Sequence, residues 1–103
     1  MPIMEISIVP VGTKNSSISD YVACSEMAVK RQNKGLKSQI TAMGTLIESD
    51  SLEKLLGIAQ EMHKKALSCG AKRVYTTITI DDRHDKKMSI EGGVESVKRK
   101  IAV

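Results

Sequence analysis

Apolar and polar residues alternate along two stretches of the chain, and this period of two predicts β-strands. The stretches are residues 3–11 (IMEISIVPV) and residues 72–82 (KRVYTTITIDD). Their apolar positions are Met4, Ile6, Ile8, Val74, Ile78 and Ile80. The positions between them are Glu5, Ser7, Val9, Tyr75, Thr77, Thr79 and Asp81. We expect the apolar set to face a core, and the hydroxyl-rich set to form the opposite face of a sheet.

Two longer stretches have the spacing of amphipathic helices. The first helix is predicted to begin near Ser17, which starts a capping-box pattern, and to end at Gly35. The second is predicted to begin at Asp50 or Ser51 and to end at Gly70. Its expected buried stripe consists of Leu52, Leu55, Leu56, Ala59, Met62, Ala66 and Leu67.

Between these helices, residues 37–42 and 45–49 are predicted to form a hairpin around a turn at 43–44. A short helix is expected after Ser89, with Ile90, Val94, Val97 and Ile101 on one face. The element order is then β-α-β-β-α-β followed by a helix. This order predicts an α+β fold, the ferredoxin-like sandwich with a four-stranded antiparallel sheet, as a single domain over residues 1–103. Two helices would cover one face of the sheet and leave the other open.

Composition adds a reason to expect self-association. The chain of 103 residues has no Phe or Trp, so its core is built from aliphatic residues and Met. A core of this size buries a modest fraction of the surface, and a dimer or tetramer would add buried area. The net charge of +4 permits an anionic partner without requiring one.

The cysteines and the chain's first residues favour a cytoplasmic location. Cys24 and Cys69 are far apart in the sequence, and unpaired thiols fit a reducing compartment. Cys24 lies beside the apolar stripe of the first helix and is expected to pack there. The first residues lack the pattern of a signal peptide, and no stretch approaches the roughly 20 apolar residues that span a bilayer, so no membrane contact is expected.

The hydroxyl-rich face has two interpretations. Threonine is a good strand former on a solvated surface. Alternatively, the face stacks on a partner subunit and frames a polar pocket. Thr45 and Glu48 are candidates for the polar pocket. They have opposite parity on their strand, so they point to opposite faces, and the sequence leaves open which face each one occupies.

Metal binding and catalysis have little support. Asp81, Asp82, His84 and Asp85 are adjacent on an extended stretch, where successive side chains point apart, and Arg83 is expected to pair with them. The chain contains no nucleophile motif and no phosphate-binding loop. We therefore expect no metal, no cofactor and no enzymatic activity.

Four segments, taken in order, resemble the thiamine-binding family of small ferredoxin-like proteins: EISIVPVGT, SISDYVA, MGTLIE and GAKRVYTTITIDDR. One departure is Ser49, where the family tends to have Gly. The resemblance implies a non-enzymatic protein that binds thiamine or its pyrimidine part. It also implies dimers, often paired as tetramers, with the ligand near subunit interfaces.

The ligand's chemistry suggests which residues hold it. A carboxylate can accept from the exocyclic amine or a protonated ring nitrogen of an aminopyrimidine, and hydroxyls can bond the rest of the ring. The candidate ligand-binding residues are Ser7, Thr45, Glu48, Thr77 and Asp81, with Glu48 as the main anchor and Asp81 offsetting the thiazolium charge.

Two other classes remain as alternatives. A regulatory module that binds another metabolite, such as an amino acid, shares this element order. An RNA-binding module does too, but the first and third strands lack the aromatic residues on which such modules stack bases. The lysines are also scattered rather than gathered in a stripe.

Overall fold

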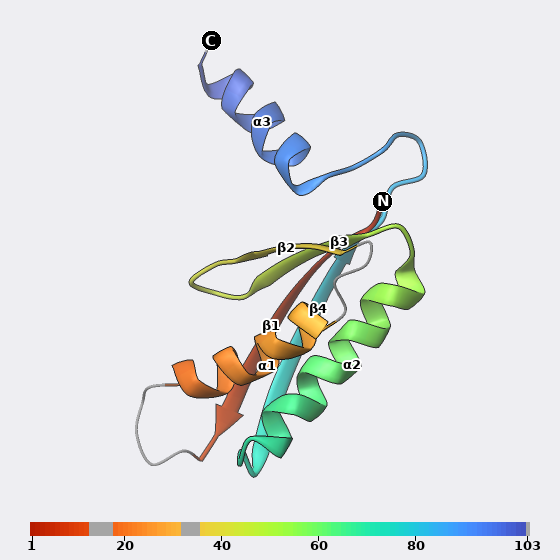
Figure 1. The fold of residues 1–103 in the computed structure, drawn as a ribbon. Coiled ribbons are helices and arrows are strands. Elements are labelled where there is room, and N and C mark those ends of the chain that lie inside the picture. Colours follow the sequence, from red (N-terminus) through yellow and green to blue (C-terminus); the bar gives the residue numbers. More distant parts are fainter. Residues whose placement is uncertain (13–17, 32–35, 103) are drawn as a thin grey trace.

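A computed structural model describes residues 1–12, 18–31 and 36–102 (Figure 1). The strands are β1 (Ile3–Val11), β2 (Leu36–Ile40), β3 (Thr45–Ser49) and β4 (Arg73–Asp81). The helices are α1 (Ser19–Arg31), α2 (Leu52–Ser68) and α3 (Ile90–Ile101). The predicted starting residue Ser17 and the predicted helix end Gly35 lie outside the described residues. The predicted order of elements is confirmed.

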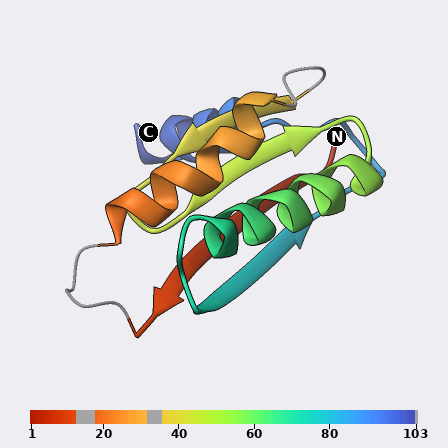
Figure 2. The same ribbon diagram turned by 60° about the horizontal axis from the view of Figure 1, so that its bottom comes forward.

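The strands form one antiparallel sheet in the order β2-β3-β1-β4. Figure 2 shows α1 and α2 side by side on one face of this sheet, with β4 along one edge. This arrangement is the ferredoxin-like sandwich, and it confirms the predicted fold class. We call the face under α1 and α2 the helix face and the other the open face.

The register settles which side chains share a face. Met4 pairs with Ile80 and Ile47, and all three lie on the helix face. Ser7 pairs with Thr77, on the open face. The alternation of faces predicted for β1 and β4 is confirmed, but Ile78, which was expected to face the core, is 41% exposed. In the hairpin, Thr45 lies on the helix face beside Ile6, whereas Glu48 lies on the open face beside Ile3.

The core lies between the helix face and the two covering helices. Its fully buried side chains include Met4, Ile6, Ile47, Leu55, Ile58 and Met62. Burying an aliphatic or Met side chain contributes about 1.5–3 kcal/mol, so these residues stabilise the sandwich without aromatic side chains. The small Ala59 and Ala66 of α2 are also buried and allow close packing.

The predicted buried stripe on α2 includes residues that the structure leaves exposed. Leu52, Leu56 and Leu67 are 40%, 47% and 40% exposed, respectively, while Ile58, which the prediction omitted, is buried. At 100° per residue the three exposed leucines lie on one flank, together with His63. His63 Nδ1 lies 2.7 Å from the hydroxyl of Thr76 on β4, so this flank faces the β4 edge of the sheet.

The ends of α2 match the sequence prediction. Ser51 is the N-cap, and its hydroxyl accepts from the backbone N–H of Lys54. The chain leaves the helix at Gly70, whose φ of +110° is a conformation that side chains disfavour. The hairpin differs slightly: β2 ends at Ile40, and the turn spans 41–44 rather than two residues.

Helix α3 lies on the opposite side of the sheet from α1 and α2 (Figure 1). Ser89 caps it by accepting from the backbone N–H of Gly92. The carboxylate of Glu48, on the open face, accepts a hydrogen bond of 2.8 Å from the backbone N–H of Ile90. Ile90 is buried, but the other apolar residues on this face of α3 are exposed: Val94, Val97 and Ile101.

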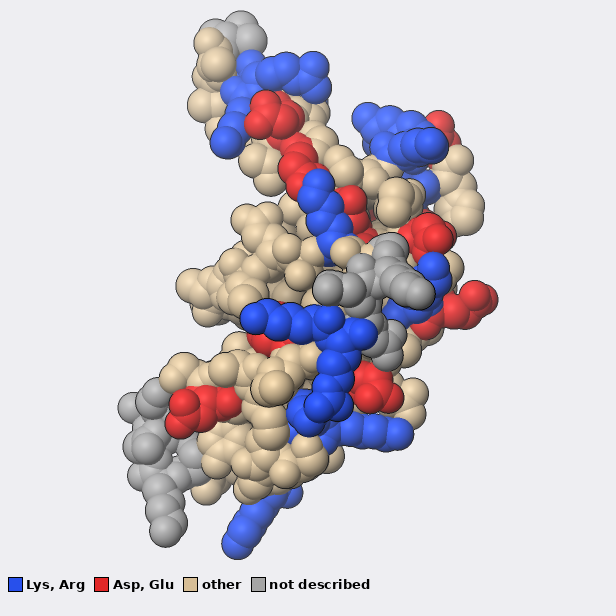
Figure 3. Space-filling model, in the orientation of Figure 1, with Lys and Arg blue, Asp and Glu red and all other residues tan. Residues whose placement is uncertain are grey.

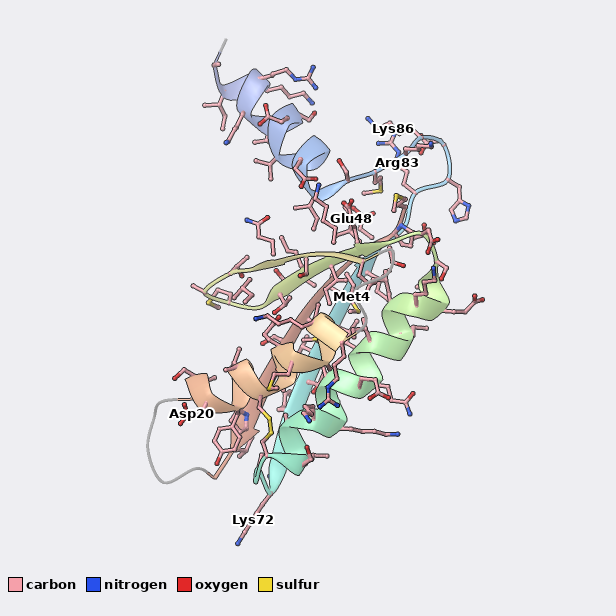
Figure 4. All side chains as sticks on the ribbon, in the orientation of Figure 1. Met4, Asp20, Glu48, Lys72, Arg83 and Lys86 are labelled. Atoms are coloured by element: carbon pink, nitrogen blue, oxygen red, sulfur yellow. A yellow bond between two sulfur atoms is a disulfide. The ribbon has the colours of Figure 1, made fainter. Side chains whose placement is uncertain are left out.

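Cys24 and Cys69 are joined in a disulfide, which corrects the expectation of unpaired thiols (Figure 4). Their Cα atoms are 6.6 Å apart, within the range that a disulfide spans. The bond ties α1 to the C-cap of α2. The pairing could not be predicted from the spacing of the two cysteines in the sequence, because it is the packing of α1 against α2 that brings them together.

Candidate functional site

A cavity of about 260 Å³ lies on the helix face, between α1, β1 and the β2–β3 hairpin. Most of its lining is apolar, including Ile6, Ile8, Val22, Ile40 and Met62. The lining also includes the polar residues Ser7, Ser25, Thr41 and Thr45. An apolar hollow with a few placed polar groups is the usual form of a small-molecule site.

Glu26 is a charged group that contacts the lining of this cavity. It lies on α1, one turn after Val22, which lines the cavity, and only 9% of its surface is exposed. The hydroxyl of Thr45 donates to its Oε1. A carboxylate has room for about four hydrogen bonds, so the Thr45 hydroxyl, its donor among the described residues, uses only part of its acceptor capacity.

A shallower hollow of about 620 Å³ continues outward from the cavity along α1. Glu26 lines it, together with Met27, Lys30, Ile40 and Ala42. Residues Ile18, Val22, Ile40 and Ala42 line both hollows, so the two share a border. Glu26 therefore stands where the apolar cavity opens toward solvent.

The turn 41–44 shapes one wall of the cavity. The Thr41 hydroxyl donates to the carbonyl of Gly44 at 2.8 Å and accepts from its backbone N–H at 3.1 Å. A Cβ at Gly44 would lie 2.9 Å from the carbonyl oxygen of Ile6, so this position requires glycine. The turn is thus held against β1, next to Thr45.

This geometry is suited to a flat heterocycle with hydrogen-bond donors on its edge. The apolar lining can cover the ring faces, and Glu26 can accept from an amine or a protonated ring nitrogen. A charge-assisted bond of this kind is stronger than a neutral one.

The predicted site residues do not come together in one place. Thr45 lies in the helix-face cavity, and Ser7 lies along its border on β1. Thr77 is the cross-strand partner of Ser7 on the open face. Asp81 and Glu48 flank Ile3 on the open face, four residues along β1 from Ser7, which is about 13 Å.

Glu48 has a structural partner. It is 7% exposed, and its carboxylate is bonded to the backbone N–H of Ile90 (Figure 4). A negative charge at the first turn of α3 is favourable because of the helix dipole. Close by, Lys37 and Glu91 form an ion pair that raises the pKa of Lys37 and lowers the pKa of Glu91, chiefly through their hydrogen bond.

The charged loop after β4 is arranged by pairing between its own residues. The guanidinium of Arg83 donates to the carboxylate of Asp85, as predicted, and this hydrogen bond lowers the pKa of Asp85. His84 Nε2 lies 3.3 Å from the carboxylate of Asp82. Among the described residues, no group of three His, Cys, Asp or Glu side chains is placed to hold a metal ion.

The face of the molecule seen in Figure 3 carries charges of both signs. In Figure 3 the acidic side chains of the described residues lie among the basic ones on the visible face. No helix in the described ranges is long and apolar enough to cross a bilayer.

Sequence reasoning missed Glu26. The residue is placed among the apolar positions of α1, three residues before Val29 and four after Val22. A carboxylate on the buried side of a helix is costly without partners. This conflict between charge and position could have identified Glu26 from the sequence alone.

Comparison with known proteins places the chain in a family. The profile described as "Thiamine-binding protein" matches residues 4–98. A UPF0045 protein of Methanothermobacter thermautotrophicus is 41% identical over 97 residues, which cover 94% of this chain and 96% of that protein.

Solved structures of other proteins have the same fold as this chain. Protein MJ1052 of Methanocaldococcus jannaschii superposes with a TM-score of 0.84 at 34% identity, over 94% of this chain and 95% of that one. Protein TM0486 of Thermotoga maritima, described as a candidate in thiamine biosynthesis or salvage, shares the fold with a TM-score of 0.75 at 17% identity, over 93% of this chain and 97% of that one. The chain belongs to the thiamine-binding protein family.

Proposed function

We propose that this protein binds thiamine or a related aminopyrimidine, without turning it over, in the cavity between α1 and the β2–β3 hairpin. The observation that carries this proposal is the buried carboxylate of Glu26, which accepts from the Thr45 hydroxyl beside an apolar cavity.

The chemistry of the ligand supports this placement. An aminopyrimidine presents an exocyclic amine beside a ring nitrogen, and a carboxylate can accept from both when that nitrogen is protonated. Glu26 takes the role that the sequence prediction gave to Glu48. Thr45 keeps its predicted role and also orients the Glu26 carboxylate.

The wider, shallower hollow beside Glu26 suits the rest of thiamine. The thiazolium ring is cationic, and a site lined by a carboxylate can hold a cation near solvent. Ser7, as a neighbour of the cavity, is retained as a contributor. Thr77 and Asp81 lie on the open face, where a ligand at a subunit interface would meet them. Glu48 lies on the same face, but its carboxylate is buried and bonded to α3.

The test is calorimetry with thiamine, its pyrimidine fragment and its phosphates. Glu26→Gln keeps the shape of the side chain and removes its charge. A hydrogen bond to a charged group contributes about 1.5–3 kcal/mol, so affinity for the pyrimidine-containing ligands should fall by about tenfold or more.

Glu48→Gln is the matched control, because it makes the same chemical change on the opposite face. The proposal expects it to leave thiamine affinity unaltered. If Glu48→Gln weakens binding and Glu26→Gln does not, the site lies on the open face. If an amino acid or an RNA binds and thiamine does not, one of the other functional classes is correct.

A further inference from the structure

A hollow of about 600 Å³ lies between α3, the loop that joins β4 to α3, and the open face of the sheet. It is on the opposite side of the sheet from the cavity beside Glu26 (Figure 1). Its apolar floor includes Ile3, Leu46, Met88, Ile90, Val94 and Val97. Val94 and Val97 are 47% and 57% exposed, so part of this floor is open to solvent. The volume is within the range of small-molecule sites.

The rim of the hollow is mainly cationic. Its charged lining consists of the basic residues Arg83, Lys86, Lys87 and Arg99 and one acidic residue, Asp81. Arg83 and Lys86 extend from the loop before α3 (Figure 4). The hydrogen bond from Arg83 and, to a lesser extent, the charge of Lys86 lower the pKa of Asp85, so these two cations are partly neutralised. Lys87 and Arg99 form no ion pair with a carboxylate of the described residues. Even with Asp85 counted, four cations face two carboxylates.

Gly93 leaves one wall of the hollow without a side chain. Glycine lowers the stability of a helix, so its presence within α3 needs a reason. At Gly92 the reason is the cap, because a Cβ there would lie 2.8 Å from the hydroxyl oxygen of Ser89. At Gly93 a Cβ would meet nothing within 4 Å. The fold can therefore accept a side chain at Gly93, and its absence keeps the hollow open.

The backbone at the start of α3 is already bonded within the fold. The N–H of Ile90 donates to Glu48, and the N–H of Gly92 donates to the Ser89 hydroxyl. The N–H of Gly93 donates to the carbonyl of Ser89. Since these three amides are occupied, an anion in the hollow would be held by the side chains of the rim.

From the apolar floor, the cationic rim and the open wall we propose that this hollow binds an amphipathic anion, a small molecule with a phosphate or carboxylate group and a short apolar body. The anionic group would meet the cations of the rim, and the apolar body would cover the exposed valines of α3. Thiamine carries a positive charge, so this ligand differs from the one proposed for the cavity beside Glu26. Because the two sites lie on opposite faces of the sheet, the test does not depend on thiamine binding.

Calorimetry of the full chain with hexyl phosphate, inorganic phosphate, hexanol and hexylammonium separates charge from apolar contact. Hexyl phosphate should bind with one molecule per chain and more tightly than inorganic phosphate or hexanol, whereas hexylammonium should not bind. From ethyl to butyl to hexyl phosphate, affinity should rise by about fourfold for each CH₂ that is buried. Hexanoate is tested beside hexyl phosphate, and binding of either anion in this pattern supports the proposal. Equal binding of hexyl phosphate and hexylammonium, or no gain over inorganic phosphate, would overturn it.

Charge variants locate the anionic group. Arg99→Gln and Lys87→Gln should each weaken hexyl phosphate binding by about tenfold, because each removes a charged hydrogen-bond donor. Lys98→Gln is the matched control, since Lys98 is next to Arg99 on α3 but does not line the hollow. It also removes one positive charge. Equal losses in Arg99→Gln and Lys98→Gln would indicate general attraction to a basic surface and would refute a site in the hollow.

A larger side chain at Gly93 tests the hollow itself. Gly93→Leu should abolish hexyl phosphate binding by filling the space beside the floor. Gly57→Leu on α2 is the matched control, because a Cβ at this helix glycine would also meet nothing within 4 Å. It should bind hexyl phosphate as the wild type does, with circular dichroism confirming that both variants fold. Binding kept in Gly93→Leu would contradict the proposal, as would a short RNA that displaces hexyl phosphate and binds more tightly.

Discussion

Replacing Glu48 with alanine should release α3 from the sheet while the sandwich stays folded. The backbone N–H of the buried residue Ile90 donates to Glu48 at 2.8 Å. Leaving a buried donor unpaired costs about 1–3 kcal/mol. Losing a negative charge at a helix N-terminus costs about 0.3–1 kcal/mol more. Together, these losses destabilise the docking of α3 by about 1–4 kcal/mol.

In the described part of the chain, the other contacts of α3 with the sheet are few. Beyond Ile90, its apolar side chains Val94, Val97 and Ile101 are exposed. The ion pair between Lys37 and Glu91 is exposed as well, and such pairs contribute about 0–1 kcal/mol. The core residues between the sheet and α2 are untouched by the substitution. The loss should therefore appear as local opening of α3 rather than as global unfolding.

Hydrogen exchange read by mass spectrometry measures this difference. Peptides from α3 should lose protection by about tenfold or more in Glu48→Ala, because each 1.4 kcal/mol corresponds to a factor of ten. Peptides from α2 serve as the internal control and should not change. Glu48→Gln, which keeps an acceptor oxygen, should have a smaller effect. If α3 keeps its protection in Glu48→Ala, the carboxylate does not anchor the helix.

Three further outcomes are expected. Below the ordinary pKa of a glutamate, the protection of α3 against exchange, measured relative to the intrinsic exchange rate at each pH, should fall. The lowered pKa of Glu91 means that its contribution to stability is present above that ordinary pKa and is lost as pH falls through the folded-state value, and Glu91→Gln should remove this part of the pH dependence. Gly44→Ala should lower the free energy of unfolding in urea by about 1–3 kcal/mol, because its Cβ would lie 2.9 Å from a backbone oxygen; no loss would mean that the turn can shift. Reducing the bond between Cys24 and Cys69 should lower the melting temperature, with a stability loss of about 2–4 kcal/mol, and a Cys24→Ser/Cys69→Ser variant should not respond to the reductant.

The fold was predictable because its long strands have a clear period. β1 and β4 alternate over nine residues each, so parity alone assigned their faces correctly. The hairpin strands have five residues each, and the turn between them is longer than the predicted two residues. In a short strand, alternation shows which side chains point to the same face of the sheet, but it does not show which of the two faces is buried. Only the register with β1 places Thr45 and Glu48.

The flank of α2 shows a second limit of periodicity. The pattern groups every apolar residue on one side of the helix, but a single sheet covers a narrower arc than these residues span. Leu55, Ile58 and Met62 are buried, whereas Leu56, next to Leu55 in the sequence, is 47% exposed. The pattern was not wrong about which residues are apolar. It could not predict which of these apolar residues the fold buries and which it leaves exposed.

The disulfide and the candidate site depend on contacts between distant segments. Cys24 and Cys69 are 45 residues apart, and Thr45 and Glu26 are 19 apart. No local spacing specifies such pairs, because they are products of packing. Glu26 is different, since its charge contradicts the apolar side of α1 on which it lies. Such local conflicts are expected at functional sites, where stability is given up for chemistry.

Glu26 and Glu48 are both buried, but their hydrogen-bond partners differ. This difference distinguishes a carboxylate that stabilises the fold from one that is available to a ligand. Both side chains have less than a tenth of their surface exposed. Glu48 accepts from a backbone N–H in the first turn of α3, where such groups have no partner within the helix, so its charge and its bond are both used within the fold. Glu26 is bonded by a hydroxyl, which can rotate to another acceptor, and it borders a cavity rather than a helix end. A donor-rich ligand would therefore complete the bonding of Glu26, whereas it would have to displace α3 to reach Glu48.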